Sequence, residues 1–429
     1  MSELNKIALK IISGGKGILA ADESNGTMTK RLEAVGLPST PENRLLFRET
    51  IMSSQSMKEC IGGVILYDET INQTTSFGNA GVLSPWSCVP QSIPGLWKNV
   101  PKWLLEPEGP LFISLSYAPK FLPWLIQFLK AGEIKKIEKI SKALLALNQP
   151  CVDSYKRLVA GTGHENLISD SCYLHVYRNK QGASPESISW KIRQEQGVPL
   201  SFLSKNEIQE VEPEISPNIK SAVMIERQGR TTNPGRLGEV LFKKATDLGV
   251  LFHKKKIQRL FPKAGESYEL QSDRGNIACN KIVLAAGAWS VELLKSIKIK
   301  IPLEAERGYH LIFPNPEIKV TNSIMDGDRK FVTSSMEMGV RSAGTAEFSG
   351  LNSKPNFNRA RIFERLTKEL LPNLNACDLR EWSGVRPSLP DTLPCIGPVP
   401  GHPNIIAAFG HSHLGLTQAP MTANIVSCL

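Results

Sequence analysis

Residues 68–81 read DETINQTTSFGNAG, and the sequence changes character across this stretch. On its N-terminal side, residues 60–67 form the continuous apolar run CIGGVILY, which is typical of a strand in a parallel sheet covered on both faces. On its C-terminal side lie small residues and two glycines, Gly78 and Gly81, which allow a backbone to approach a ligand closely. The stretch therefore predicts a junction, near residue 73, between two differently built segments.

The N-terminal segment has the order helix, turn, strand. Apolar residues recur at helical spacing over residues 4–12, glycines follow at residues 14–17, and residues 18–21 form a short apolar run of strand type. The loose dinucleotide pattern Gly15-x-Gly17-x-x-Ala20 falls here, but a dinucleotide loop needs a strand before the glycines and a helix after them. We therefore interpret this segment as βα units and not as a cofactor-binding turn.

Three stretches of this segment resemble the N-terminus of class I fructose-bisphosphate aldolase: GKGILAADESNGT at residues 15–27, TPENRLLFRE at 40–49 and CIGGVILYDET at 60–70. The resemblance implies a partial TIM-barrel βα segment, with Asp22 as an aldolase-like active-site residue at the end of a barrel strand. The alternative is a strand-end aspartate that caps a helix. A closed barrel needs eight strands and about 250 residues, and the family's Schiff-base lysine, on a later strand, is absent. Aldolase activity is therefore not expected.

Four later segments resemble the FAD-dependent D-amino-acid oxidase and dehydrogenase family, most closely the bacterial D-amino-acid dehydrogenases. They are TTSFGNAG at residues 74–81, KIVLAAGAWS at 281–290, WSGVRP at 382–387 and GHSHLGLT at 410–417. The segment before the second of them reads as a helix from residue 235 and a strand at residues 250–252. The resemblance implies FAD as the cofactor.

The same resemblance implies which residues contact the flavin. The loop at residues 74–81 would pass over the ring, and backbone N–H groups of residues 412–417 would stabilise the negative charge of the reduced ring. A polar turn and a plain structural role are the alternatives for the first two segments. The implied cofactor-binding residues are Thr75, Ser76, Ala80, Gly81, Gly287, Ser412, His413, Leu414, Gly415, Leu416 and Thr417.

Substrate binding is implied for two further residues. Arg386 would hold the substrate carboxylate, because a planar guanidinium offers two parallel hydrogen bonds and stays charged. A surface salt bridge is the alternative. Tyr309, with His310 beside it, would line the substrate pocket or pack in the core. A metal role for His411 and His413 is not expected, because residues i and i+2 do not share a helical face.

One element of the family pattern is missing. No strand–GxGxxG–helix unit and no following acidic residue precede SFGNAG, although these normally hold the FAD pyrophosphate and ribose. The expected fold class is α/β (α+β): an incomplete FAD/NAD(P)-binding Rossmann-like domain and a mixed-sheet substrate domain, preceded by the partial TIM-barrel segment. The expected domains are 1–73, aldolase-like, and 74–429, with cofactor-binding parts at 74–100, 225–300 and 378–429 and substrate parts at 101–224 and 301–377.

Composition limits the other classes of function. The net charge of +10 comes from dispersed basic residues without a recognised nucleic-acid module, so nucleic-acid binding is not expected. The eight cysteines form no CxxC pair, so reduced thiols and no structural zinc are expected.

The apolar run at residues 121–129 is far below the roughly 20 residues of a membrane span. It is either a buried core helix or an interfacial membrane contact. No secretory signal is recognised, which predicts a cytoplasmic protein, at most peripheral at the inner face of the membrane.

The sequence thus predicts a flavoprotein that oxidises D-amino acids, or another small amino acid, by hydride transfer from Cα to flavin N5. Loss of the dinucleotide-binding unit would impair it. Expected partners are the amino-acid substrate and a quinone or respiratory-chain acceptor, with no nucleic acid. The alternatives are an aldolase and a non-catalytic fusion remnant.

Overall fold

The computed structural model describes residues 17–21, 32–34, 36, 38–40, 43, 61–66, 74–98, 100–253, 255–264 and 267–429. The chain divides into two compact units, Met1–Gln73 and Thr74–Leu429. Asp22, the aldolase-like candidate, lies outside the described residues.

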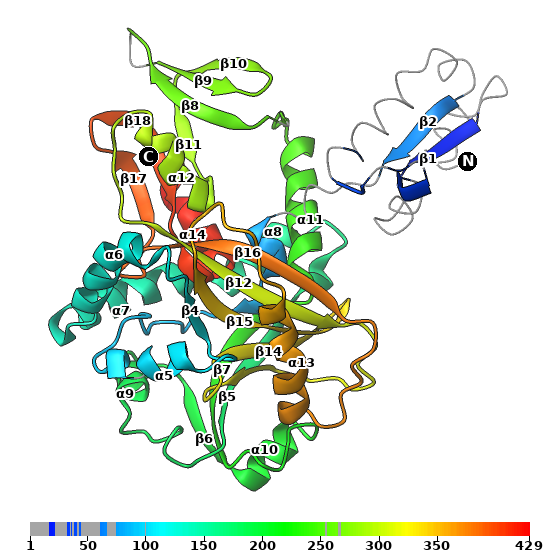
Figure 1. Ribbon diagram of the computed structural model, residues 1–429, viewed down its shortest axis with the longest axis vertical. Coiled ribbons are helices and arrows are strands. Elements are labelled where there is room, and N and C mark those ends of the chain that lie inside the picture. The colour runs from blue at the N-terminus through cyan, green and yellow to red at the C-terminus, as the bar shows by residue number, and fades with distance from the viewer. Residues whose placement is uncertain are drawn as a thin grey trace. The chain divides into compact units, whose positions relative to one another are not determined.

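The N-terminal unit contains a two-stranded parallel sheet. Strand β1 (Gly17–Ala21) pairs with β2 (Ile61–Leu66), with Leu19 opposite Val64 (Figure 1). Both strands coincide with the apolar runs that predicted them. Parallel neighbours need a long crossover connection, as in a βα barrel, so the pairing agrees with the partial barrel segment expected from the sequence.

The larger unit is built around a mixed sheet of ten strands. Strand β13 runs parallel to β5, and β4 runs parallel to β15, whereas the other pairs are antiparallel. This confirms the predicted α/β class with a mixed sheet. In spatial order the strands are β16 (Arg380–Ser388), β12 (Glu304–Phe313), β15 (Gly339–Phe348), β14 (Phe331–Met336), β13 (Ser323–Asp326), β5 (Ile168–Tyr177), β7 (Ser221–Thr231) and β3 (Val82–Leu83), with β4 (Leu111–Ile113) on β15 and β6 (Leu200–Ser204) on β7.

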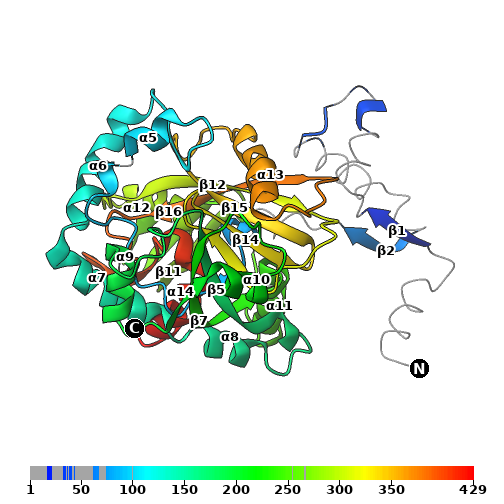
Figure 2. The ribbon, with the colours of Figure 1, turned by 90° about the horizontal axis from the view of Figure 1, so that it is seen from below.

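The two faces of this sheet have different surroundings. One face carries the main core, in which strand residues such as Leu174 and Phe313 pack with Phe363 and Leu370 of α13 (Asn358–Leu370). Figures 1 and 2 show α13 lying along the strands near β12. Because strand side chains alternate between faces, the neighbours of Leu174 on β5 point the other way, towards a cavity.

Two smaller sheets complete the larger unit. Strand β11 (Ile282–Leu284) runs parallel to β18 (His402–Phe409), which pairs with β17 (Cys395–Val399). Among the described strands β11 has no second neighbour, and Val283 is 52% exposed. A separate antiparallel sheet contains β8 (Ile257–Pro262), β9 (Tyr268–Ser272) and β10 (Gly275–Cys279).

The predicted strand at residues 250–252 is wrong. These residues follow α11 (Pro234–Asp247) as irregular backbone, and Leu251 is 81% exposed. A strand needs a neighbour for its N–H and C=O groups, and no described strand lies beside this segment to pair with it.

Helices surround the sheets, and none of those in the described part of the chain has the length and apolar character to span a membrane. The cysteines among the described residues are free thiols. The remaining helices are α5 (Val100–Leu105), α6 (Ala118–Ala131), α7 (Ile134–Asn148), α8 (Cys151–Val159), α9 (Ile188–Glu195), α10 (Lys205–Val211), α12 (Ser290–Lys295) and α14 (Gly415–Ser427), with 3-10 turns η3 (Thr75–Gly78), η4 (Leu96–Lys98), η5 (Glu165–Leu167), η7 (Gly287–Trp289) and η8 (Ser412–Leu414).

Candidate active site

A cavity of about 1110 Å³ lies between the open face of the ten-stranded sheet and the segments singled out in the sequence. It brings together the loop at residues 75–80, the turn at Gly287, the strand that carries Arg386, and the start of α14. The first and last of these segments are about 340 positions apart in the chain. Of the predicted site residues, Thr75, Ser76, Ala80, Gly287, Tyr309, Arg386, Ser412, His413, Leu414, Gly415, Leu416 and Thr417 line it, and Gly81 does not.

The loop of residues 74–81 is fixed against β16. The Thr75 hydroxyl donates to the Val385 carbonyl over 2.9 Å. Gly78 lies directly on the indole of Trp382, where a Cβ atom would stand 1.9 Å from a ring carbon. Trp382 in turn stacks on His310, with 4.9 Å between ring centroids. Only glycine therefore fits at position 78.

Arg341 holds the same loop from the sheet side. Its side chain is fully buried on β15, and Nη1 donates to the carbonyl oxygens of Phe77 and Asn79 over 2.8 and 2.7 Å. Burial lowers the pKa of this guanidinium to about 10. Sequence reasoning missed Arg341, because an arginine within a strand carries no local sign that its partners lie about 260 residues away.

Gly81 ends the loop as a turn residue. Its φ of +79° is in the region that favours glycine, its N–H donates to Asn79 Oδ1, and its carbonyl accepts from the Thr231 N–H. Its observed contacts are thus with the protein, and a flavin contact at Gly81 stays a prediction.

The start of α14 opens onto the cavity. Turn η8 precedes it, and Ser412 there has a φ of +49° and a buried hydroxyl with no hydrogen-bond partner among the described residues. A Cβ atom on Gly415 would meet only the His411 Cβ, at 3.7 Å, and one on Gly287 would meet nothing within 4 Å. Gly287 has a φ of +54°, which by itself favours glycine, whereas neither packing nor backbone conformation explains Gly415, and a flat ligand against its backbone would.

These observations test the fit of FAD in two parts. The orphaned Ser412 hydroxyl, the open space at Gly287 and Gly415, and the N–H groups at the start of α14 suit the electron-rich edge of an isoalloxazine ring. The dinucleotide end differs. Residues 74–429 contain no GxGxxG sequence, and no described strand pairs with the second edge of β11. The ring fits this site, and the usual pyrophosphate elements are missing from the larger unit.

Arg386 lines the cavity but is already paired. Its Nη1 donates to Glu306 over 2.6 Å and to the Thr345 carbonyl over 2.9 Å, and its guanidinium lies flat over Gly308. Burial disfavours charge on Glu306, but Arg386 and the Ser388 hydroxyl outweigh it, so the pKa of Glu306 lies below its ordinary value. The pair is therefore ionised and almost neutral as a unit.

Tyr309 has the contacts of a core residue. Its side chain belongs to the core cluster with Leu311 and Phe313, and its hydroxyl donates to Glu347 over 2.7 Å and accepts from the Asn356 N–H. Burial raises the pKa of this phenol. A role for Tyr309 in substrate binding stays a prediction.

Of the histidines in this region, His310 is buried and His411 is half-buried, and both contact polar groups of the protein, whereas His413 is exposed and contacts Gln91. His310 Nδ1 lies 3.2 Å from the Gly78 carbonyl, and His411 Nε2 lies 2.8 Å from the Thr422 hydroxyl. Burial holds the pKa of His411 at about 4. Within the described ranges, no group of three or more His, Cys, Asp or Glu side chains is arranged to hold a metal ion.

Comparisons with known protein families find two matches. The model described as FAD dependent oxidoreductase matches residues 59–429, and the model described as Fructose-bisphosphate aldolase class-I matches residues 3–83. The two matches overlap at residues 59–83, around the junction quoted first. Both resemblances found in the sequence are thus confirmed, and the aldolase match covers only the N-terminal part of the chain.

Curated relatives and solved structures agree with the longer match. A D-amino-acid oxidase of Bradyrhizobium diazoefficiens is 36% identical over 362 residues, which cover 83% of this chain and 86% of that protein. A D-amino acid dehydrogenase of Rhizobium rhizogenes is 27% identical over 360 residues, with the same coverage of each chain.

Among solved structures, glycine oxidase from Geobacillus kaustophilus superimposes with a TM-score of 0.59 and 18% identity, over 68% of this chain and 78% of that one. Iminodiacetate oxidase from Chelativorans sp. gives a TM-score of 0.59 with 14% identity, over 96% and 94%. These structures show a shared fold. The family match and the 36% identical relative show more: the chain belongs to the FAD-dependent oxidoreductase family.

Proposed function

We propose that this chain oxidises D-amino acids with FAD. The proposal rests on one observation above all: the start of α14, the turn at Gly287 and Arg386 meet around one cavity. The 36% identical D-amino-acid oxidase supports the choice of substrate. When bound, FAD supplies an acceptor for the hydride that leaves the amino-acid Cα.

The residues that would hold the flavin ring are those with open space or spare donors. Gly287 and Gly415 would let the ring lie against the backbone, and the N–H groups at the start of α14 would face its electron-rich edge. Thr75 and Ser76 would lie on the loop beside the ring, held there by Arg341.

Arg386 would bind the substrate carboxylate with the donors that Glu306 leaves unused. One of its nitrogens, Nη1, is committed, and Nη2 makes only a 3.5 Å contact with the Gly344 carbonyl. Glu306 would then be a positioning residue that keeps the guanidinium flat over Gly308. Apolar walls around the cavity would exclude water from the Cα.

The test is an anaerobic titration of FAD-loaded protein with D-alanine and with L-alanine, followed by the flavin absorbance. We expect D-alanine to bleach the flavin and L-alanine to leave it oxidised. Protein that binds FAD but is bleached by neither amino acid would contradict the proposal. Bleaching by L-alanine alone would assign the opposite configuration.

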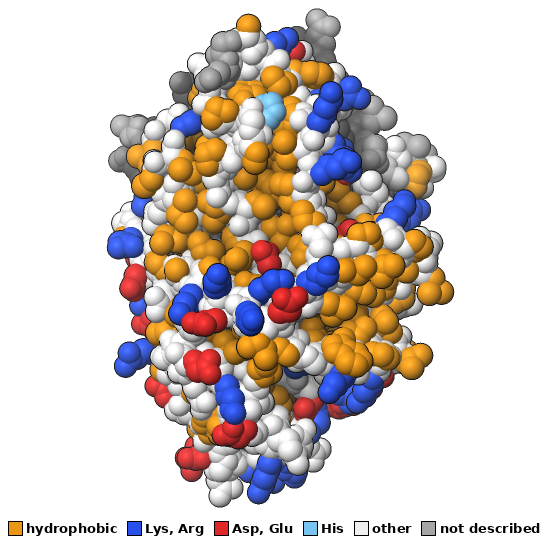
Figure 3. Space-filling model, turned by 90° about the vertical axis from the view of Figure 1, so that its left-hand side faces the viewer, with side chains coloured by type: hydrophobic (Ala, Val, Ile, Leu, Met, Phe, Trp, Pro, Cys, Tyr) orange, Lys and Arg blue, Asp and Glu red, His pale blue; other side chains and the backbone are white. Residues whose placement is uncertain are grey.

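A surface feature supports peripheral attachment to a membrane. Helix α6 buries Phe121 and Trp124 against Phe348, yet Leu122, Ile126 and Leu129 on its outer side are 53%, 46% and 41% exposed. Residues 96–142 also carry eight lysines and only four glutamates. Figure 3 views the side on which α6 and α7 lie, where hydrophobic side chains gather beside lysines and arginines.

An amphipathic surface of this kind binds anionic lipid through apolar area and positive charge together. The helix at residues 121–129 would thus combine both alternatives seen in the sequence, core packing on one side and membrane contact on the other. A quinone dissolved in the bilayer would then be the electron acceptor.

We expect the protein to sediment with phosphatidylglycerol vesicles and to sediment less with phosphatidylcholine vesicles. The double variant Leu122→Gln/Ile126→Gln should sediment less with phosphatidylglycerol vesicles than the parent protein does. A matched control is Phe202→Gln on β6, which is 38% exposed. Equal loss in control and variant would contradict the attachment.

A further inference from the structure

Arg193 is a cation at the cavity wall whose charge no carboxylate of the described residues neutralises. It lies on α9, where Nη1 donates to the Ser189 carbonyl over 3.1 Å and Cζ stands 4.7 Å from the centre of the Trp190 ring. Its Nε is buried without a hydrogen-bond partner among the described residues. An arginine held in this way has donors to spare and a fixed orientation.

Strand β5 presents three ring side chains to the same part of the cavity. Tyr173, His175 and Tyr177 alternate along the strand and all line the wall. His175 packs edge-on against Tyr173 and Trp190, with ring centroids 4.6 and 5.2 Å away, and its Nε2 is buried with no partner among the described residues. Burial, together with the nearby charges of Arg193 and Lys330, holds the pKa of His175 well below its ordinary value. A neutral ring here can donate one hydrogen bond to a ligand.

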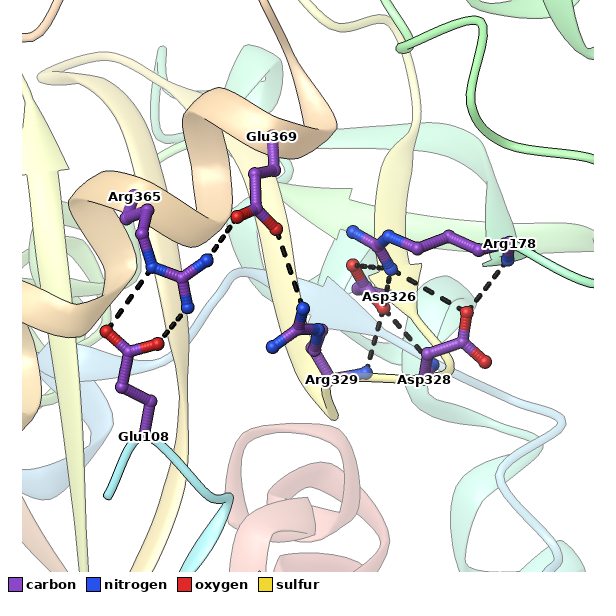
Figure 4. A network of polar contacts seen from close by, with 7 residues as sticks. All are labelled: Glu108, Arg178, Asp326, Asp328, Arg329, Arg365 and Glu369. Atoms are coloured by element: carbon purple, nitrogen blue, oxygen red, sulfur yellow. Dashed lines mark hydrogen bonds and ion pairs between the residues drawn. The ribbon is translucent and has the colours of Figure 1, made fainter. Parts of the chain in front are cut away.

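The carboxylates of Asp326 and Asp328 are already paired with another cation. Figure 4 shows Arg178 between Asp326 and Asp328, with Nη1 2.8 Å from an Asp326 oxygen and 3.6 Å from an Asp328 oxygen. Lys330, four residues after Asp326, lines the cavity beside them.

Asp326 and Asp328 are thus paired with Arg178 and also act on Lys330, whereas no carboxylate of the described residues acts on Arg193. The neighbouring network in Figure 4 is balanced, because Arg329 and Arg365 contact Glu369 and Glu108.

This part of the wall contrasts with the position of Arg386. There the guanidinium already has Glu306 as its counter-ion, whereas Arg193 has none among the described residues. Arg193 is half-buried, and a positive charge partly withdrawn from water without a counter-ion is costly, a cost that an anionic ligand lowers. The aromatic rings of Tyr173, Tyr177 and Trp190 would flank the carbon chain of the same ligand.

We propose that Arg193, assisted by Lys330 and His175, is a second anion-binding position of the cavity and takes a carboxylate of the substrate. This inference depends on the proposed function only in that it identifies the bound anion as the substrate. If the substrate is an acidic amino acid, its side-chain carboxylate would bind Arg193 and its α-carboxylate would bind Arg386. Alternatively, the α-carboxylate itself would bind Arg193. Experiment separates the two cases.

The experiment measures ligand binding without relying on flavin. Tryptophan fluorescence of the full chain would be titrated with propionate, a monocarboxylate, and with glutarate, a dicarboxylate, at constant ionic strength. Trp190 lies against Arg193 and reports on the site, and Trp190→Phe identifies its share of the signal. We expect Arg193→Met to raise the Kd for glutarate by roughly 10- to 100-fold, because a charge-assisted bidentate contact is lost. Arg193→Lys should restore part of the affinity.

Two further variants separate the effect of Arg193 from a general effect of losing positive charge. Lys330→Met removes the neighbouring charge without touching the packed Arg193 side chain, and should weaken glutarate less than Arg193→Met does. Arg259→Met, at an exposed position of β8, is the matched control for loss of one positive charge. If Arg193→Met fails to fold by circular dichroism, Lys330→Met and His175→Phe carry the test.

Each possible outcome either supports or overturns the proposal. Weakening of glutarate alone supports the position and assigns it to a side-chain carboxylate, whereas equal weakening of both ligands supports it and assigns it to the α-carboxylate. Unchanged Kd values in the folded site variants, or no glutarate response in the parent protein, would overturn the proposal. Failure of the FAD oxidation itself would leave these Kd values standing, so the two proposals fail separately.

Discussion

Arg386 and Glu306 face each other at directly opposed positions of β16 and β12, with 2.6 Å between Nη1 and the carboxylate oxygen. The side chain of Glu306 is only 5% exposed, and that of Arg386 is 20% exposed. A second hydrogen bond, from the Ser388 hydroxyl over 2.5 Å, fixes the other oxygen of Glu306. The residue expected to anchor the substrate is thus also part of a structural ion pair, and its substitution has two separable consequences.

Arg386→Ala should destabilise the fold and abolish oxidation at once. Removing one partner leaves the other as an unpaired buried charge, which costs about 3–5 kcal/mol of unfolding free energy. The double variant Arg386→Met/Glu306→Gln removes both charges and should regain most of that stability. It should not regain activity, because loss of a carboxylate anchor costs about 2–5 kcal/mol of transition-state binding.

Urea unfolding and kcat/KM for D-alanine measure the two consequences independently. A double variant that is stable and as active as the parent would place the substrate carboxylate at another residue. A double variant no more stable than Arg386→Ala would show that the ion pair is not the source of the loss.

Gly78→Ala should disorder the loop beside the cavity. The new methyl group would lie within 2 Å of the Trp382 ring, so the indole must leave its stack on His310 or the loop must move away from β16. Overpacking of this kind costs about 1–3 kcal/mol. Near-ultraviolet circular dichroism should show the change in the environment of Trp382.

Gly238→Ala is the matched control for that substitution. Gly238 is exposed on α11, and nothing lies within 4 Å of its Cβ position, so alanine should stabilise the helix by up to about 1 kcal/mol. Loss of stability in both variants would point to a general intolerance of alanine for glycine and not to the contact with Trp382.

Binding of FAD should be weak for a member of this family. The cavity keeps the residues that suit the flavin ring, but residues 74–429 contain no GxGxxG turn for the pyrophosphate, and no described strand lies on the second edge of β11, where such a unit would pair. Several polar contacts worth about 0.5–1.5 kcal/mol each are lost, which weakens binding by several powers of ten.

Titration of apoprotein with FAD, followed by flavin fluorescence, measures this affinity. Stoichiometric binding at nanomolar concentration would contradict the prediction, and would show that residues 1–73 supply the phosphate contacts. Riboflavin, which has no pyrophosphate, should bind almost as well as FAD if only the ring is held.

Fructose-bisphosphate cleavage should be absent. The N-terminal unit has two paired strands among its described residues, far from the eight of a barrel, and the family's Schiff-base lysine is missing from the sequence. Without a covalent amine the carbanion has no electron sink. Incubation with dihydroxyacetone phosphate and borohydride, followed by peptide mass analysis, tests this. An adduct reduced onto a single lysine would contradict it.

The sequence predicted those parts of the site that are contiguous in the chain. The loop at residues 74–81 and the helix start at residues 412–417 each match a contiguous motif of the family they resemble, and residues of both line the cavity. Strands β1 and β2 were likewise predicted, because each is an unbroken apolar run bounded by glycine or polar residues.

What the sequence did not predict depends on partners distant in the chain. The pairing of Arg386 with Glu306 follows from the register of β16 on β12, and the hold of Arg341 on the loop follows from the position of β15. Arg193 lies in a helix without any motif, and only the fold brings it to the wall with Tyr173 and His175. The strand expected at residues 250–252 was wrong because a strand forms only where a neighbour accepts its hydrogen bonds.

Stability should fall with pH between about 6.5 and 4, in part because of His411. Burial lowers the pKa of this imidazole in the folded protein to about 4, from an ordinary value of 6.5. Because the folded pKa is the lower one, the unfolded chain binds the proton more readily in this window. The contribution is therefore fully present above pH 6.5 and is lost as pH falls towards 4, by at most about 1.4 kcal/mol per pH unit.

His411→Gln can keep the hydrogen bond to Thr422 and removes the titrating group. The difference in unfolding free energy between parent and variant should thus shift in favour of the variant on acidification. This difference also cancels the similar contributions of the buried His175 and His310, whose pKa values are lowered in the same direction. Urea unfolding at half-unit steps from pH 7 to 4.5 measures it, and parallel curves for the two proteins would show that His411 takes up its proton equally well in the folded and unfolded states.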